Sequence, residues 1–179
     1  MPKIIPDVRN RILDSARKQL GENGYTGLSL RGVAEDCQIA VGTTYNYFPS
    51  KAALVAAVME SDWNEAIQEI DGQFSSVTSI TDAICTIYKT IFKFSKTYWN
   101  IFSHSYEVST NNEPVRDSHD KLMDNIKNKL QEIMEKFGYS ENDSFMTLIS
   151  QTLLYAAIQN HKEEDIKELA ERLFPEKKG

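Results

Sequence analysis

The chain has 179 residues, of which 41% are hydrophobic and 26% charged, and its formal net charge is −6. These proportions are ordinary for a soluble globular protein with a buried core. No run approaches the roughly 18 apolar residues that a membrane-spanning helix needs. The first residues lack the apolar stretch of a signal peptide, and the two cysteines are too far apart to suggest a disulfide framework or a zinc cluster. We therefore expect a cytoplasmic protein that does not bind membranes.

The charge is divided unevenly along the chain. Residues 1–60 carry seven Lys and Arg against six Asp and Glu, whereas residues 61–179 carry thirteen against twenty. The net charges of the two parts are thus +1 and −7. A basic first part is the asymmetry expected of a nucleic-acid-binding region, but this one is too weakly basic to identify such a region by charge alone.

Helical spacing of apolar residues recurs throughout, and strand-like alternation does not persist anywhere. The first helix is expected over about residues 7–22. Two short helices and a longer one beginning at Ser50 follow it. Five more are expected: Ser79–Ser95, Thr97–Val108, Val115–Phe137, one opened by Ser140, and Glu163–Phe174. The sequence thus predicts an all-α protein of about nine helices.

The two short helices flank a tight turn. Ser29 is a good N-cap residue, and Leu30, Val33 and Ala34 after it share one helical face. Cys37–Ile39 would form the turn, and Val41–Tyr47 would form the second helix. A helix–turn–helix places its second helix in the major groove of DNA while the first lies across the backbone. This segment therefore predicts a DNA-binding domain over residues 1–49, followed by a second helical domain over residues 50–179.

The side chains of the second short helix suit a DNA contact. Thr43 and Thr44 offer hydroxyls for base edges or phosphates, and Gly42 permits a close approach of the backbone. Tyr45 and Tyr47 offer phenolic hydroxyls suited to phosphate oxygens. The full set of candidate DNA-binding residues is Ser29, Arg31, Val41, Gly42, Thr43, Thr44, Tyr45, Tyr47 and Lys51.

Residues 11–59 resemble the DNA-binding domain of the TetR family of bacterial transcriptional repressors. The resemblance lies in the pair Gly24–Tyr25, in Ser29-x-Arg31-x-x-Ala34, and in Gly42-Thr43-x-Tyr45-x-Tyr47-Phe48-x-Ser50-Lys51. It implies that Tyr45, Tyr47 and Lys51 clamp the DNA backbone and that Arg31 reaches DNA from the preceding helix. It also implies a homodimer that binds a palindromic operator.

Three positions depart from the pattern of the family. Gln38 stands where many members have glycine, so we expect a small strain in the turn. Ala40 and Val41 stand where Ser-Lys is common. The missing hydroxyl cap should weaken the second helix by about 1 kcal/mol, and the missing lysine removes one DNA contact. The operator sequence therefore cannot be inferred by analogy.

Residues 145–158 are apolar on nearly every helical face. A helix of this kind must be covered all round, which favours a second copy of the chain as its other partner. The resemblance agrees, because the last two long helices form the dimer interface in the family. The alternative is a central helix within one subunit. The candidate interface residues are Leu153, Leu154, Ala157, Ile158, Leu169 and Leu173.

The second domain is rich in aromatic residues, which suit a pocket for a small hydrophobic or aromatic effector. The plainer explanation is that these rings simply fill a helical core. His104 and Glu107 stand three residues apart, but the other histidines are isolated in sequence, so no metal site is predicted. The candidate pocket residues are Trp63, Tyr88, Phe92, Trp99, Phe102, His104 and Tyr106.

Three functional hypotheses remain. The chain is a ligand-responsive dimeric repressor, a helix–turn–helix regulator without a small-molecule ligand, or a helical-bundle enzyme or scaffold with an incidental helix–turn–helix. No nucleophile elbow, phosphate-binding loop or zinc-protease motif is found in the sequence. We therefore predict no catalytic residues and no cofactor, and we favour the first hypothesis.

Overall fold

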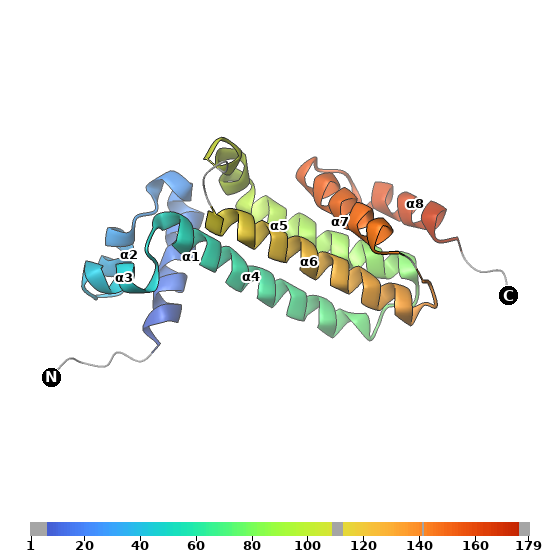
Figure 1. Ribbon diagram of the computed structural model, residues 1–179, viewed down its shortest axis with the longest axis horizontal. Coiled ribbons are helices and arrows are strands. Elements are labelled where there is room, and N and C mark those ends of the chain that lie inside the picture. Colours follow the sequence, from blue (N-terminus) through green and yellow to red (C-terminus); the bar gives the residue numbers. More distant parts are fainter. Residues whose placement is uncertain (1–6, 109–112, 141, 176–179) are drawn as a thin grey trace. The chain divides into compact units, whose positions relative to one another are not determined.

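The computed structural model describes residues 7–108, 113–140 and 142–175, without the side chains of residues 99–116 (Figure 1). The described residues form eight α-helices and no strand, so the predicted all-α fold is confirmed. No described helix has the length and apolarity to cross a membrane. The helices are α1 (Val8–Gly27), α2 (Leu30–Asp36), α3 (Val41–Tyr47), α4 (Lys51–Phe74), α5 (Ile80–Val108), α6 (Glu113–Lys136), α7 (Asp143–Ile158) and α8 (Glu163–Leu173).

The chain divides into two compact units. The first unit comprises Met1–Asp62 and Asn100–Ser118, and the second comprises Trp63–Trp99 and His119–Gly179. The boundaries between the units fall within α4, α5 and α6, so each of these helices contributes residues to both units. The domain boundary after residue 49 stays a prediction.

One expected boundary between helices is absent. The sequence predicts separate helices before and after Lys96, but α5 runs through this point without interruption. Ser95 donates a hydrogen bond from Oγ to the Phe92 carbonyl at 2.9 Å, a contact made by a residue inside a helix and not by an N-cap. Neither glycine nor proline stands between Ser95 and Thr97 to stop the helix. The count is therefore eight described helices, one fewer than predicted.

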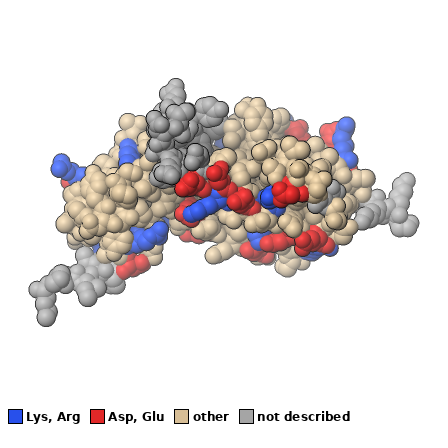
Figure 2. Space-filling view, viewed as in Figure 1, with Lys and Arg blue, Asp and Glu red and all other residues tan. Residues whose placement is uncertain are grey.

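The second unit is held by an apolar core from α4 to α8 and by polar links at its surface. The Tyr88 hydroxyl donates to the His161 carbonyl, which joins α5 to the segment before α8. Lys129 of α6 reaches Asp71 of α4, with Nζ 2.6 Å from Oδ1. Figure 2 shows acidic and basic side chains side by side over α6. Fully buried core residues are Ile70, Ile87, Ile91, Ile126, Leu130, Ile133 and Leu153.

The end of α1 contains a kink at Gly24. Its backbone has φ 65° and ψ −174°, a conformation essentially restricted to glycine. Helical residues continue after the kink, so α1 ends at Gly27 and not at residue 22 as the sequence predicts. The kink also directs the chain into Leu28, whose N–H bonds the Gly24 carbonyl at 3.3 Å.

We expect opposite effects from two glycine-to-alanine substitutions in α1. Gly24→Ala should lower the free energy of unfolding by about 1–3 kcal/mol, because alanine is strained at this φ and ψ. Gly21→Ala should raise it by about 0.4–1 kcal/mol, because its Cβ would meet no atom within 4 Å and the unfolded chain loses freedom. Urea denaturation of both variants measures the difference, and equal effects would contradict the assigned kink.

Candidate DNA-binding surface

Contacts from α1 fix the helix–turn–helix in the first unit. Arg11 donates from Nη2 to the Cys37 carbonyl at 2.7 Å, and the Cys37 thiol lies 3.2 Å from the Arg11 carbonyl. One residue earlier, Asp36 accepts hydrogen bonds from Gln19 Nε2 and from Ser15 Oγ, each at 2.8 Å. These two bonds, chiefly that from Gln19, lower the pKa of Asp36. Hydrogen bonds at Asp36 and Cys37 thus connect the end of α2 to α1.

The start of α2 has the cap predicted from the sequence. The Ser29 hydroxyl accepts a hydrogen bond from the Gly32 N–H at 3.0 Å. Leu30, Val33 and Ala34 are buried, as their spacing predicts. Arg31, on the other side of this short helix, is exposed.

The turn and the start of α3 carry the two expected weaknesses. Gln38 adopts φ 54°, a left-handed conformation that is costly for a residue with a side chain. Ala40 is the N-cap residue of α3 and makes no side-chain capping bond. Because α3 has only seven residues, it depends on packing against α2 for its stability.

The outward face of α3 consists of Gly42, Tyr45 and Asn46, all exposed, with Tyr45 at 51%. Val41 and Thr43 are half-buried at its edges. Sequence analysis missed Asn46, although it stands four residues after Gly42 and helical periodicity places the two on one face. An asparagine amide can bond both polar groups of an adenine edge in the major groove.

Thr44 lies on the opposite face of α3, and this changes its expected role. The side chain is fully buried, at 0% exposure, and its hydroxyl has no hydrogen-bond partner. A side chain in this position packs in the core of the first unit and is not presented at the surface. We therefore remove Thr44 from the DNA-contacting set.

Lys51 begins α4 and contacts the end of α1. Its Nζ lies 3.2 Å from the Thr26 carbonyl and 4.5 Å from the centre of the Tyr25 ring. Partial burial lowers the pKa of the ammonium group. Tyr47, at the end of α3, is 46% exposed. Lys51 thus has a structural role in the first unit besides its predicted contact with DNA.

The candidate pocket residues are only partly described. Trp63 and Tyr88 are buried, and Phe92 is half-buried with its ring centre 5.9 Å from that of Tyr88. Among the described residues, no three His, Cys, Asp or Glu side chains are grouped to hold a metal ion. Four candidates have side chains outside the described residues: Trp99, Phe102, His104 and Tyr106.

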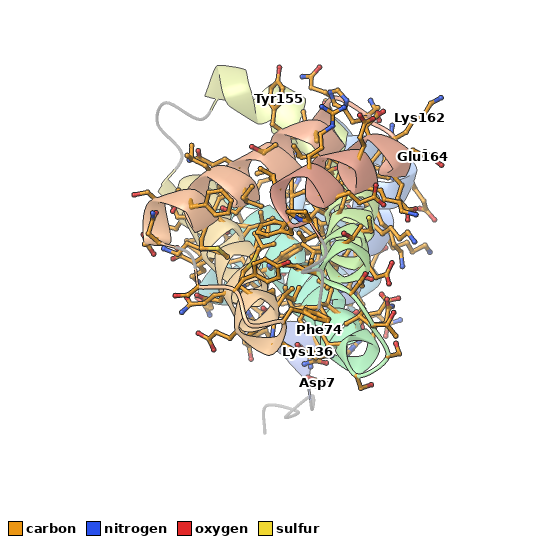
Figure 3. All side chains as sticks on the ribbon, turned by 90° about the vertical axis from the view of Figure 1, so that its right-hand side faces the viewer. Asp7, Phe74, Lys136, Tyr155, Lys162 and Glu164 are labelled. Carbon is orange, nitrogen blue, oxygen red and sulfur yellow. The ribbon has the colours of Figure 1, made fainter. Side chains whose placement is uncertain are left out.

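The candidate interface residues differ widely in exposure. Leu153 and Ala157 are 1% exposed and belong to the core of their own subunit. Leu154, Ile158 and Leu169 are half-buried, and Leu173 is 39% exposed. The outward face of α7 instead carries two large apolar side chains that the sequence analysis did not select. These are Leu148, at 61% exposure, and Tyr155, at 64%, which points outward from α7 in Figure 3.

The segment that carries the candidate DNA-binding surface matches a known family of proteins. Residues 12–58 match the family described as bacterial regulatory proteins, tetR family. The HTH-type transcriptional regulator UidR of Escherichia coli is 34% identical over 83 residues, covering 41% of this chain and 42% of UidR. Over residues 12–58 the chain therefore resembles the DNA-binding segment of the TetR family. The HTH-type transcriptional repressor KstR of Rhodococcus jostii is 40% identical over 55 residues, covering 31% of this chain and 26% of KstR.

The matches thus span less than half the length of these curated relatives. Solved structures extend the likeness to the rest of the fold. The multidrug binding protein EbrR, complexed with imidazole, is 18% identical with a TM-score of 0.68, covering 98% of this chain and 94% of EbrR. RolR without ligand is 19% identical with a TM-score of 0.70, and the match covers 92% of this chain and 89% of RolR. At these identities the likeness shows the fold alone.

We expect Thr44→Val to stabilise the chain. The substitution replaces a buried hydroxyl that has no partner by a methyl group of similar shape, and so removes a desolvation penalty of about 1–3 kcal/mol. Thr43→Val, at a half-buried position, serves as the control and should change stability by less than about 0.5 kcal/mol. The denaturation midpoints measure both effects. A lower midpoint for Thr44→Val would show that the hydroxyl has a partner in solution.

Proposed function

We propose that this chain is a sequence-specific, DNA-binding transcriptional repressor that acts as a homodimer and releases its operator when a small hydrophobic or aromatic effector binds. The observation that carries the proposal is the exposed face of α3, presented by a helix–turn–helix within the segment that matches the family. The relatives UidR and KstR, named as a transcriptional regulator and a transcriptional repressor, support it. On the same ground we infer a cytoplasmic location and no enzymatic activity.

The contacts with DNA divide into base and phosphate contacts. Asn46 and Thr43 are suited to base edges, and Gly42 permits a close approach of the backbone to DNA. Arg31, Tyr45 and Tyr47 are suited to phosphate oxygens on either side, and Ser29 lies beside Arg31 at the start of α2. Two copies related by a two-fold axis would bind half-sites spaced by about one helical turn or a multiple of it. The operator is therefore a palindrome in this proposal.

The homodimer is supported by the surface of α7. Leu148 and Tyr155 stand seven positions apart, which is about two helical turns. The exposed residues Gln151 and Thr152 lie between them on the same face of α7. Large apolar side chains at such exposure are usual at interfaces. The proposed interface therefore contains Leu148 and Tyr155 with Leu154, Ile158, Leu169 and Leu173 at its edges. Leu153 and Ala157 support it from within the subunit.

The response to an effector requires a link between α1 and α4. Arg17 of α1 provides one, with Nη2 2.7 Å and Nε 2.7 Å from Asp62 Oδ1. The hydrogen bond to Asp62 raises the pKa of the Arg17 guanidinium, and Asp14 holds its Nη1 at 2.6 Å. A displacement of α4 at Asp62 would thus move α1, and α1 holds the turn before α3. An effector acts in this way only if it binds the displaced conformation more tightly.

Known ligands of similar structures do not identify the effector. Solved structures with a similar fold include a regulator FadR from Bacillus subtilis in complex with stearoyl-CoA, with a TM-score of 0.60, and a putative regulator from Saccharomonospora viridis in complex with choline, with a TM-score of 0.62. These two ligands differ in charge and size, so only the general class of a small-molecule effector is carried over here.

Two substitutions should separate base contacts from phosphate contacts. Asn46→Ala should lower the preference for the operator over other sequences by about 1–3 kcal/mol, because it removes a base contact. Arg31→Ala should weaken binding to all sequences alike and reduce the slope of log affinity against log salt by about one unit. Binding isotherms at several salt concentrations measure both. Lys51→Ala is less informative, because it also removes the contacts with Thr26 and Tyr25.

The DNA-binding proposal fails if selection from random duplexes at low salt enriches no motif. The assignment of Asn46 to base edges and Arg31 to phosphates is wrong if both alanine substitutions change the affinity for every sequence by the same factor.

Charge on the outward face of α7 should prevent dimerisation. An obligate interface buries upward of about 2,000 Å², and an unpaired charge at its centre is expensive. Tyr155→Glu and Leu148→Glu should therefore give monomers in sedimentation at micromolar concentration, whereas Gln68→Glu, an exposed position on α4, should leave the dimer intact. A monomer for the unmodified chain would overturn the proposed assembly.

A further inference from the structure

The indole N–H of Trp63 is buried without a partner. Trp63 is 3% exposed, and its Nε1 makes no hydrogen bond. An indole nitrogen can only donate, and buried tryptophans usually place this group against an acceptor. A buried donor without an acceptor lowers stability, and a bound molecule that supplies an acceptor would remove that penalty. The indole N–H of Trp63 is therefore able to donate to an acceptor on a bound molecule.

The surroundings of Trp63 restrict the kind of ligand. Its ring meets Phe94 edge-on with centroids 5.1 Å apart, and Phe94 in turn lies 4.8 Å from the Tyr98 ring. All three side chains are buried within the second unit, and they come from α4 and α5. Trp63, Phe94 and Tyr98 thus form a buried cluster of aromatic rings in which Trp63 Nε1–H makes no hydrogen bond. A molecule that inserts beside these rings is favoured if it is planar and apolar.

The charge of the ligand can also be limited. None of the three side chains of this described cluster is charged at neutral pH. Burying a carboxylate there without a cation would be far more costly than burying a neutral oxygen. A neutral acceptor such as a ketone, ester or amide carbonyl satisfies the indole N–H without that cost.

We propose that Trp63 is the specificity-determining donor for the effector, and that the effector is an aromatic or apolar compound with a neutral carbonyl oxygen bound to Trp63 Nε1–H. This inference rests on the proposed function, since it names the chemistry of that same effector. Apolar contact with Phe94 supplies affinity, and the hydrogen bond selects among compounds of the same shape. Trp63 follows Asp62 directly in α4, so a ligand at Trp63 binds next to the residue that Arg17 holds.

The test uses pairs of compounds that differ only in the acceptor. 2-Acetylnaphthalene with 2-isopropenylnaphthalene is one pair, and acetophenone with α-methylstyrene is another; each pair exchanges a carbonyl oxygen for a CH2 group. In titrations of the full chain, the ketone should bind about three- to tenfold more tightly than the alkene. Trp63→Phe should abolish this preference. Phe94→Leu, the matched control, should weaken both members of a pair and keep the preference.

A second measurement does not depend on a substitution. In a spectrum of the chain with 15N-labelled tryptophan, the Trp63 indole N–H signal should move downfield on addition of the ketone and not on addition of the alkene. The inference is overturned if no ketone binds, if ketone and alkene bind equally, or if a long-lived water contacts this N–H in the ligand-free chain. Release of the operator is measured separately. If the ketone binds in preference to the alkene but does not release the operator, the proposed function is contradicted while Trp63 is still the donor to the bound ketone.

Discussion

The position of α3 depends on the hydrogen bonds that α1 makes to the end of α2. Arg11 and Cys37 exchange contacts at 2.7 and 3.2 Å, and Asp36 is held from the same helix. The short helix that follows cannot hold its own orientation, because seven residues without a capping side chain are far below the length at which an isolated helix is stable. The exposed face of α3 therefore inherits its direction from α1. Any force that moves α1 also moves the proposed DNA-binding surface.

A local rule was sufficient to predict the cap of α2 from the sequence. Ser29 was recognisable as a cap because its hydroxyl stands just before an apolar helical pattern, and it bonds the Gly32 N–H as expected. That prediction involves residues at most four positions apart, so the chain alone contains what decides it. The strain at Gln38 was predicted from the family resemblance, because many members have glycine at this position, and Gln38 adopts a left-handed conformation with φ 54°.

Predictions that needed a choice between helix faces succeeded less well. Thr43 and Thr44 are chemically identical neighbours, and only the packing of α3 against the first unit shows that Thr44 is buried and Asn46 is exposed. In α7 nearly every residue is apolar, so the pattern gave no direction; the subunit core takes Leu153, and Tyr155 is left outside. The break predicted near Lys96 was wrong because a polar residue within a long helix can bond backward to its own helix, as Ser95 does.

The proposed response of the chain depends on two consecutive residues of α4. Neighbouring residues in a helix point about 100° apart, so Asp62 and Trp63 can serve different partners from almost the same height on the axis. Asp62 is committed to Arg17 in the first unit, and Trp63 is committed to the aromatic cluster in the second. A ligand that bonds Trp63 Nε1 would favour one rotation of this turn of α4 over another. Because a packed helix moves as a body and not residue by residue, the same rotation would alter the Arg17–Asp62 contact. The free energy available for that change is limited to the difference in the affinity of the ligand for the two conformations, so a weakly bonded ligand would bind without releasing DNA.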